Sequence, residues 1–195
     1  HPVAHSFPTR RSSDLAGLAG LQEFLEQTGA SETIYVAGAP IRCGAQTFNC
    51  AIVLQSGSIL GVVPKTVIPN YREFYEKRWF TSARDAQTSE LEICGQRVPF
   101  GNDLVFSAAN AANFSFGVEL CEDLWAPVPP STYHAMAGAT LLFNISASDE
   151  LIGKSHYRRE LVKHQSGRCI SGYAYCAAGV GESTTDLVFG GHCLL

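Results

Sequence analysis

The sequence has no strong excess of charge of either sign and no long apolar run. Its 195 residues carry 14 basic and 18 acidic side chains, a net charge of −4. Without a basic excess there is no electrostatic footprint for nucleic acid or an anionic membrane, and we expect neither partner. No apolar run approaches the ~18 residues of a membrane-spanning helix. Hydrophobic residues at 46% and charged residues at 16% are instead typical of a soluble, folded globular chain.

Regular cysteine and histidine spacings are also missing. The seven cysteines are an odd number, contain no C-x-x-C pair and do not cluster with histidine at zinc-ligand spacing. This excludes a disulfide framework and a structural zinc site, and it predicts a reducing, cytoplasmic compartment. Two segments, 113–115 and 144–146, match the N-glycosylation pattern. Both lie in apolar, strand-like runs, so we interpret both as chance matches.

The two ends differ from the rest of the chain. Residues 1–15 have no apolar periodicity, and Thr9 to Asp14 match the translation of a common sequencing-adapter oligonucleotide. We therefore expect residues 1–15 to be a non-native or disordered leader and residues 16–195 to be a partial domain. Residues 186–195 are typical of a strand that enters a Gly-Gly turn and continues into another strand. We expect the domain to be incomplete at both ends.

The middle of the chain alternates helical and strand patterns. Apolar spacing predicts a helix over 15–27, a short helix over 131–139 and a longer amphipathic helix over 155–173 with basic residues on its outer face. Strands are expected over 32–42, 47–65 (a hairpin), 91–108 (a pair), 112–121, 140–148 and in two final runs, 173–181 and 185–191. Residues 66–90 are irregular and aromatic. The pattern favours an α/β or layered α+β class.

Two residues lie at the ends of predicted strands, where catalytic side chains are often found. Cys121 follows an apolar run and precedes Glu122 and Asp123. It is either a small core residue or a nucleophile presented at the sheet edge, with the next backbone N–H groups available to an oxyanion. Lys65 directly follows an apolar strand. It is either a surface lysine or a cation that stabilises charge on a tetrahedral intermediate.

Long motifs around both residues resemble a known family. The segments 62–80 (VVPKTVIPNYREFYEKRWF), 116–127 (FGVELCEDLWAP), 144–162 and 178–195 are similar to the nitrilase superfamily of carbon–nitrogen hydrolases. More narrowly, they resemble the glutamine amidohydrolase domain of glutamine-dependent NAD synthetases. The resemblance implies a four-layer αββα sandwich, here incomplete at both ends. It also implies a Glu–Lys–Cys triad in which Cys121 is the nucleophile and Lys65 the lysine.

The glutamate of that triad is where the sequence departs from the family. The family carries it in an upstream Pro-Glu segment, and nothing before Lys65 matches that segment. Glu73 resembles an auxiliary carboxylate of the family, and we do not assign it the role of the main catalytic base. We therefore expect the base to lie outside these residues and this chain alone to be nearly inactive.

The remaining implications concern ligands and partners. The substrate is glutamine, whose side-chain amide is hydrolysed through a cysteine thioester. The family's substrate-lining positions match Tyr71, Glu122, Trp125, Ser148 and Lys154. No cofactor or metal is expected in this domain; ATP and Mg belong to a synthetase domain that is absent from this chain. A homo-oligomer is expected for the complete protein. The alternatives are a stand-alone amidase of the same superfamily and a non-catalytic scaffold relative.

Overall fold

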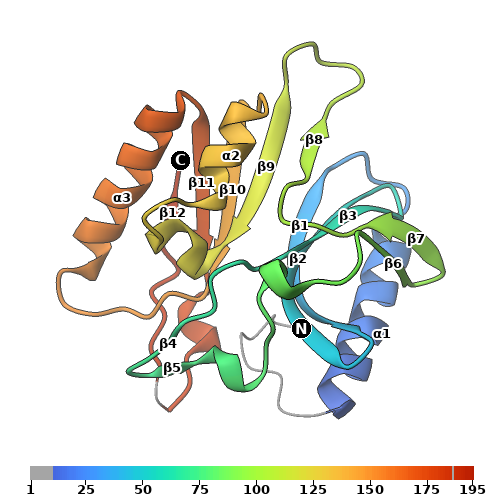
Figure 1. Ribbon diagram of the computed structural model, residues 1–195, viewed down its shortest axis with the longest axis horizontal. Coiled ribbons are helices and arrows are strands. Elements are labelled where there is room, and N and C mark those ends of the chain that lie inside the picture. The colour runs from blue at the N-terminus through green and yellow to red at the C-terminus, as the bar shows by residue number, and fades with distance from the viewer. Residues whose placement is uncertain (1–10, 186) are drawn as a thin grey trace. The chain divides into compact units, whose positions relative to one another are not determined.

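The computed structural model describes residues 11–185 and 187–195 (Figure 1). The chain divides into two compact units, the first ending at Asn102 and the second running from Asp103 to Leu195. Each unit has its own sheet and its own hydrophobic core. The predicted mixture of helices and strands is therefore confirmed.

The first unit is built on a three-stranded antiparallel meander. Strands β1 (Tyr35–Cys43), β2 (Gln46–Gln55) and β3 (Ser58–Pro64) lie in the order β1-β2-β3. Ser56 and Gly57, between β2 and β3, both have positive φ angles, +50° and +73°. Two such residues form the tight turn that matches the twist of a hairpin. The predicted hairpin over 47–65 is confirmed.

Helix α1 (Arg11–Gln27) covers this sheet. Its side chains Leu21 and Leu25 are 6% and 4% exposed and join a core that includes Phe48 and Ile52 from β2. The helix begins four residues before the predicted start at Leu15, because an apolar stripe marks where a helix is buried and not where its backbone hydrogen bonds begin. Residues 1–10 of the expected leader lie outside the described residues.

Short elements follow the meander in the first unit. The segment expected to be irregular contains a minimal hairpin, β4 (Asn70–Tyr71) with β5 (Phe74–Tyr75), and two 3₁₀ turns, η1 (Glu76–Arg78) and η2 (Ala83–Asp85). A second hairpin joins β6 (Glu90–Ile93) to β7 (Gln96–Pro99). Val98 and Phe100 from this end of the unit enter the same core as the meander.

The second unit contains a five-stranded sheet with the order β12-β11-β10-β9-β8. Its three central strands are parallel, and the two edge strands are antiparallel to their neighbours. The strands are β8 (Val105–Ser107), β9 (Ser115–Leu120), β10 (Leu141–Ser146), β11 (Gly172–Ala177) and β12 (Cys193–Leu194). The first two of the central strands end at the segments that were predicted to carry the chemistry.

The predicted strand over the last apolar run is wrong. Residues 187–192 form no strand, and pairing with β11 begins only at Cys193. The backbone N–H groups of Leu187 and Phe189 donate to the hydroxyls of Thr184 and Ser183 instead. These local side-chain acceptors replace the ladder that an apolar run alone would predict.

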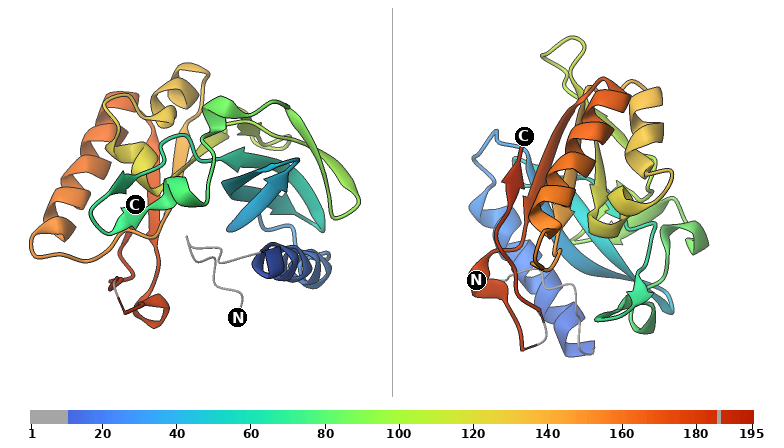
Figure 2. Two further views of the ribbon diagram at one scale, coloured as in Figure 1. Left: turned by 60° about the horizontal axis from the view of Figure 1, so that its bottom comes forward. Right: turned by 90° about the vertical axis from the view of Figure 1, so that its left-hand side faces the viewer.

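Two helices pack together on this sheet, α2 (Pro130–Met136) against β9 and β10 and α3 (Lys154–Cys169) against β11 (Figure 2). A Cβ on Gly117 of β9 would lie 2.5 Å from the ring of His134, so glycine is what lets α2 approach the strand. Helix α3 ends at Cys169, four residues before its predicted end, because Ile170 adopts a left-handed φ of +51°.

In each unit, helices thus pack on a sheet, which agrees with the α and β layers that the resemblance implies. The stacking of two such sheets into four layers stays a prediction.

Candidate functional site

Cys121 lies at a sharp corner in the backbone. Strand β9 ends at Leu120, and the 3₁₀ turn η3 (Cys121–Trp125) begins at the next residue. Cys121 has a φ of +46°, in the left-handed region that residues with a Cβ seldom occupy. Such strain persists where the surrounding contacts hold it, and it is concentrated at functional sites. The predicted placement of Cys121 at the end of a strand is confirmed.

The corner is held from two sides by buried side chains. On the neighbouring strand β10, Asn144 accepts a hydrogen bond from the Cys121 N–H at 3.0 Å and donates to the Cys121 carbonyl at 3.4 Å. Asp123 accepts from the Leu120 N–H at 3.0 Å. Asn144 is 0% and Asp123 1% exposed, so both bonds are shielded from water. From the sequence, Asn144 was interpreted as part of a chance glycosylation match, and its hydrogen bonds to Cys121 were not predicted.

A second buried polar group lies two residues before the corner. Glu119 accepts a hydrogen bond from the Ser131 N–H at the start of α2, at 2.8 Å, and another from the Tyr173 hydroxyl. Burial raises the pKa of Glu119, and these hydrogen bonds offset part of that rise. Burial also raises the pKa of Tyr173. The pair ties β9 to α2 and β11, which fixes the end of the strand that carries Cys121.

Tyr175 connects β11 to the corner electrostatically. Its hydroxyl donates to Ser146 Oγ at 2.7 Å, and the residue is 1% exposed. Burial raises the pKa of Tyr175, and the neighbouring charge of a Cys121 thiolate raises it further. Tyr175 therefore belongs to the electrostatic surroundings of Cys121.

Four of the five predicted substrate-lining residues lie in the second unit. The ammonium of Lys154 forms an ion pair with Asp149 and lies 5.6 Å from the centre of the Trp125 ring. Trp125 in turn stacks on Tyr157, with ring centres 5.4 Å apart. Ser148 is 3% exposed and belongs to the same loop as Asp149. Glu122, half-buried, belongs to the same 3₁₀ turn as Trp125.

A buried arginine organises this loop. Arg158 of α3 is 0% exposed and donates to Ser148 Oγ at 3.3 Å and to the Asp149 carbonyl at 3.0 Å. It also pairs with Glu150 at 3.2 Å and contacts His192 Nδ1 at 3.1 Å. The helix was predicted to carry basic residues on its outer face, and Arg158 is a buried exception. The acceptors on Ser148, Asp149 and Glu150 offset part of the cost of burying the Arg158 charge, while its Nε has no hydrogen-bond partner.

Lys65 is the predicted catalytic residue of the first unit. It directly follows β3, and its backbone N–H donates to the Asn49 carbonyl at 2.8 Å. The side chain is 1% exposed, so Lys65 is not a surface lysine. Its ammonium lies 2.8 Å from both carboxylate oxygens of Glu76, which is itself 3% exposed. No pattern in the sequence distinguishes Glu76 from the neighbouring Glu73.

The other two predicted residues of this unit lie at the β4–β5 hairpin. Tyr71 is 50% exposed and packs edge-to-face on Phe74 at 5.9 Å. Glu73 lies half-buried in the turn between the two strands, three residues before Glu76. The carboxylate that pairs with Lys65 is Glu76, and the auxiliary role expected for Glu73 stays a prediction.

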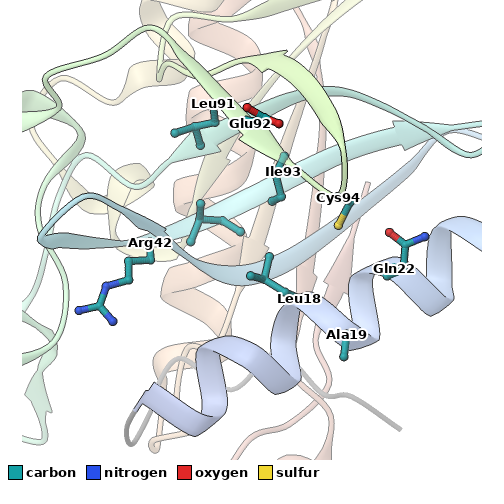
Figure 3. Close-up of a pocket in the computed structure, with 9 residues that line it drawn as sticks. Leu18, Ala19, Gln22, Arg42, Leu91, Glu92, Ile93 and Cys94 are labelled. Atoms are coloured by element: carbon teal, nitrogen blue, oxygen red, sulfur yellow. The ribbon is translucent and has the colours of Figure 1, made fainter.

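A separate pocket of about 360 Å³ lies in the first unit between α1, β1 and β6 (Figure 3). Leu18 of the helix points toward Ile93 of β6, and the walls between them are mainly apolar. None of the predicted catalytic or substrate-lining residues contributes to this pocket.

Across residues 11–185 and 187–195, no group of three or more His, Cys, Asp or Glu side chains is arranged to hold a metal ion. In the same residues, no helix is long and apolar enough to cross a membrane. All seven cysteines belong to this described part, and none of them is in a disulfide.

Comparison with known proteins gives consistent relatives. The chain is 45% identical over 162 residues to a glutamine-dependent NAD(+) synthetase of Mycobacterium tuberculosis, a match covering 83% of this chain and 24% of that protein. It is 31% identical to the synthetase of Rattus norvegicus, covering 76% of this chain and 21% of that one. No family model matches. The chain thus spans about a quarter of the length of these relatives.

Solved structures agree with the sequence relatives. A glutamine-dependent NAD(+) synthetase from Cytophaga hutchinsonii superposes with a TM-score of 0.78 at 27% identity, over 94% of this chain and 29% of that one. A CN-hydrolase superfamily protein from Xanthomonas campestris superposes with a TM-score of 0.59 at 11% identity, over 96% of this chain and 65% of that one. The second likeness shows the fold alone. The chain is therefore homologous to a segment of the glutamine-dependent NAD(+) synthetases and has the carbon–nitrogen hydrolase fold of the nitrilase superfamily, as its motifs predict.

Proposed function

We propose that this chain is the glutamine-hydrolysing part of a glutamine-dependent NAD(+) synthetase. The observation that carries the proposal is the corner at Cys121, where a thiol follows a parallel strand in a left-handed conformation bracketed by Asn144. At such a turn the thiol can reach and attack a substrate carbonyl, while the hydrogen bonds to its backbone hold it in position. The names of the sequence relatives supply the class of substrate.

In the proposed reaction, Cys121 Sγ attacks the side-chain carboxamide carbon of glutamine once a base has taken the thiol proton. The tetrahedral intermediate collapses, the C–N bond breaks and ammonia leaves. Water then hydrolyses the thioester and releases glutamate. Lys65 and the backbone N–H of Glu122 are proposed to stabilise the oxyanion. The Glu76 carboxylate fixes the position of the Lys65 ammonium, since both of its oxygens accept a hydrogen bond from that group.

The amino-acid end of glutamine is proposed to bind along Ser148, Lys154 and Trp125, with Tyr71 and Glu122 completing the lining. The Lys154 ammonium supplies a positive charge for the substrate carboxylate. It gives one point of attraction where an arginine would give a planar fork. Arg158 supports this end because it holds both Ser148 and the Asp149 carbonyl.

This chain spans about a quarter of the length of the synthetases that it resembles. We propose that ammonia passes to an ATP- and Mg-dependent synthetase domain, in a cytoplasmic protein that is a homo-oligomer when complete. No glycine-rich phosphate loop occurs in these 195 residues. The family's Pro-Glu base also has no match here, and we propose that this chain alone releases ammonia very slowly.

The test compares this chain with the same chain joined to a homologous N-terminal segment that carries the Pro-Glu strand. We expect the extended protein to release ammonia from glutamine and its Cys121→Ser variant to release none. Lys65→Met should lower turnover by about 10²–10³-fold, the range for one lost oxyanion interaction.

Three results would count against the proposal. Equal turnover of simple aliphatic amides would favour a stand-alone amidase. No hydrolysis by a folded extended protein would favour a scaffold. Full activity of the unextended chain would mean that an internal carboxylate is the base.

A further inference from the structure

Two exposed thiols face each other across the edge of the second sheet. Cys176 on β11 and Cys193 on β12 are register partners, and their sulfur atoms lie 3.8 Å apart. Both residues are exposed to solvent. Neither belongs to the corner at Cys121 or to the loop that carries Lys154. The pair is therefore a chemical feature that the proposed hydrolysis does not use.

The hydrogen-bond ladder around the pair has the geometry that a cross-strand link needs. The Ala177 N–H donates to the His192 carbonyl at 3.1 Å, so Ala177 and His192 form a hydrogen-bonded pair. Hydrogen-bonded and non-hydrogen-bonded pairs alternate along antiparallel strands, which makes Cys176 and Cys193 a non-hydrogen-bonded pair. Such partners have Cα atoms ~4.5 Å apart, within the range that a disulfide spans.

We propose that Cys176 and Cys193 are a site of reversible oxidation, closed to a disulfide by a peroxide. In the first step one thiol of the pair loses its proton and attacks hydrogen peroxide; the O–O bond breaks, a sulfenic acid forms, and the hydroxide that leaves takes up that proton as the first water. The other thiol then attacks the sulfenic sulfur, the S–O bond breaks, and the leaving hydroxyl takes the second thiol's proton and departs as water as the S–S bond forms. Both sulfurs are oxidised by one electron each and the peroxide is reduced to two waters. A thiol reductant restores the pair.

The surroundings favour this pairing over others. Closing the bond moves the sulfur atoms together by about 1.8 Å, a change that side-chain rotation at a solvent-exposed edge can supply. Partial burial and the neighbouring Cys193 thiol raise the pKa of Cys176. Cys169, the nearest other cysteine in the sequence, is half-buried and contacts Gln165 at 3.3 Å. Cys50 is 0% exposed and shielded from solvent.

The structural consequence lies in the segment between the two cysteines. Strand β12 has only two residues, so its attachment to β11 depends on few ladder bonds. The disulfide would fix it covalently and enclose residues 177–192. That segment reaches the loop before α3 through the Glu150 N–H, which donates to the Val188 carbonyl at 2.7 Å.

The chain offers a clean chemical assay. Trypsin leaves Cys169, Cys176 and Cys193 in one peptide, because no Lys or Arg follows Arg168. A second cut after Glu182 separates Cys176 from Cys193, so the two fragments stay joined only if a disulfide links them. The folded 195-residue chain is treated with hydrogen peroxide, its remaining thiols are alkylated, and the digest is analysed by mass spectrometry before and after reduction.

We expect residues 169–182 and 183–195 to be joined, with Cys169 alkylated, and separated after reduction. Cys169→Ser should leave the joined product unchanged, and Cys193→Ser should abolish it. A dominant link through Cys169, random pairing, or over-oxidation of Cys193 without a link would overturn the proposal. Since the readout is the bond itself, it is independent of glutamine hydrolysis, and failure of either proposal leaves the other standing.

Discussion

Replacing Glu76 with glutamine should destabilise the first unit strongly, because the buried Lys65 ammonium loses its counter-charge. The two side chains are 1% and 4% exposed, and the ammonium contacts both carboxylate oxygens at 2.8 Å. Removing one partner of such a pair typically costs about 3–5 kcal/mol, since the other charge stays buried without compensation. That is a large share of the ~5–15 kcal/mol by which a domain is stable.

Equilibrium unfolding in urea measures this cost. The fluorescence of Trp79 reports on the first unit, because the backbone N–H of Trp79 donates to the Glu76 carbonyl at 2.9 Å. A Trp125→Phe background removes the fluorescence of the other tryptophan. The matched control is Glu90→Gln, which breaks the exposed pair with Arg97 in the same unit. An exposed pair is worth about 1 kcal/mol or less, so the control should unfold close to the parent midpoint.

The double variant Lys65→Met with Glu76→Gln separates the charge from the shape of the site. With both charges removed, the unfolding free energy should rise above that of Glu76→Gln alone, because no uncompensated ion remains buried. If Glu76→Gln and Glu90→Gln shift the midpoint equally, or the double variant is the least stable of the three, Lys65 and Glu76 are not a buried ion pair and the reasoning is refuted.

Three further predictions concern the second unit. Asn144→Leu removes both hydrogen bonds to the Cys121 backbone and should cost about 1–3 kcal/mol in urea unfolding; an unchanged midpoint would show that Asn144 does not hold the corner. Arg158→Met should lower the unfolding free energy by about 3 kcal/mol, because Glu150 and its neighbours lose their buried cation. Arg159 is exposed, so Arg159→Met should change the unfolding free energy by no more than about 0.5 kcal/mol. Equal effects of the two substitutions would contradict the burial of Arg158. Because burial raises the pKa of Glu119 above its ordinary 4.5, its contribution to stability is full below pH 4.5 and declines as the pH rises through the folded-state pKa. Glu119→Gln should therefore flatten the pH dependence of the unfolding midpoint above pH 4.5, and a parallel curve would disprove it.

Features set by local sequence were predictable. The hairpin over 47–65 follows from two apolar runs around a small-residue turn, and the structure has it with Ser56 and Gly57 in left-handed conformations. The end of a strand at Cys121 follows from an apolar run that stops at two carboxylates. In both cases the signal is contained in neighbouring residues, where periodicity and turn chemistry act directly.

Features set by contacts distant in sequence were not. Glu76 pairs with a lysine eleven residues away, and nothing in its own neighbourhood separates it from Glu73. Asn144 reaches Cys121 only because β10 and β9 are parallel neighbours. Arg158 has the spacing of a surface helix residue, but acceptors from another loop surround it. Contacts with residues distant in sequence determine the roles of these side chains, and hydrophobic periodicity does not predict such contacts.

The measurement that tests the central claim most directly is the site of labelling by a diazo-ketone analogue of glutamine. The chain contains seven thiols, of which Cys176 and Cys193 are more exposed than Cys121. If Cys121 is the nucleophile in a glutamine pocket, the analogue should modify Cys121 first in the protein extended with the homologous Pro-Glu segment. Added glutamine should slow that reaction, while a simple alkylating agent still prefers the exposed pair. Labelling that follows exposure alone, or labelling of Cys121 that glutamine does not slow, would contradict the account.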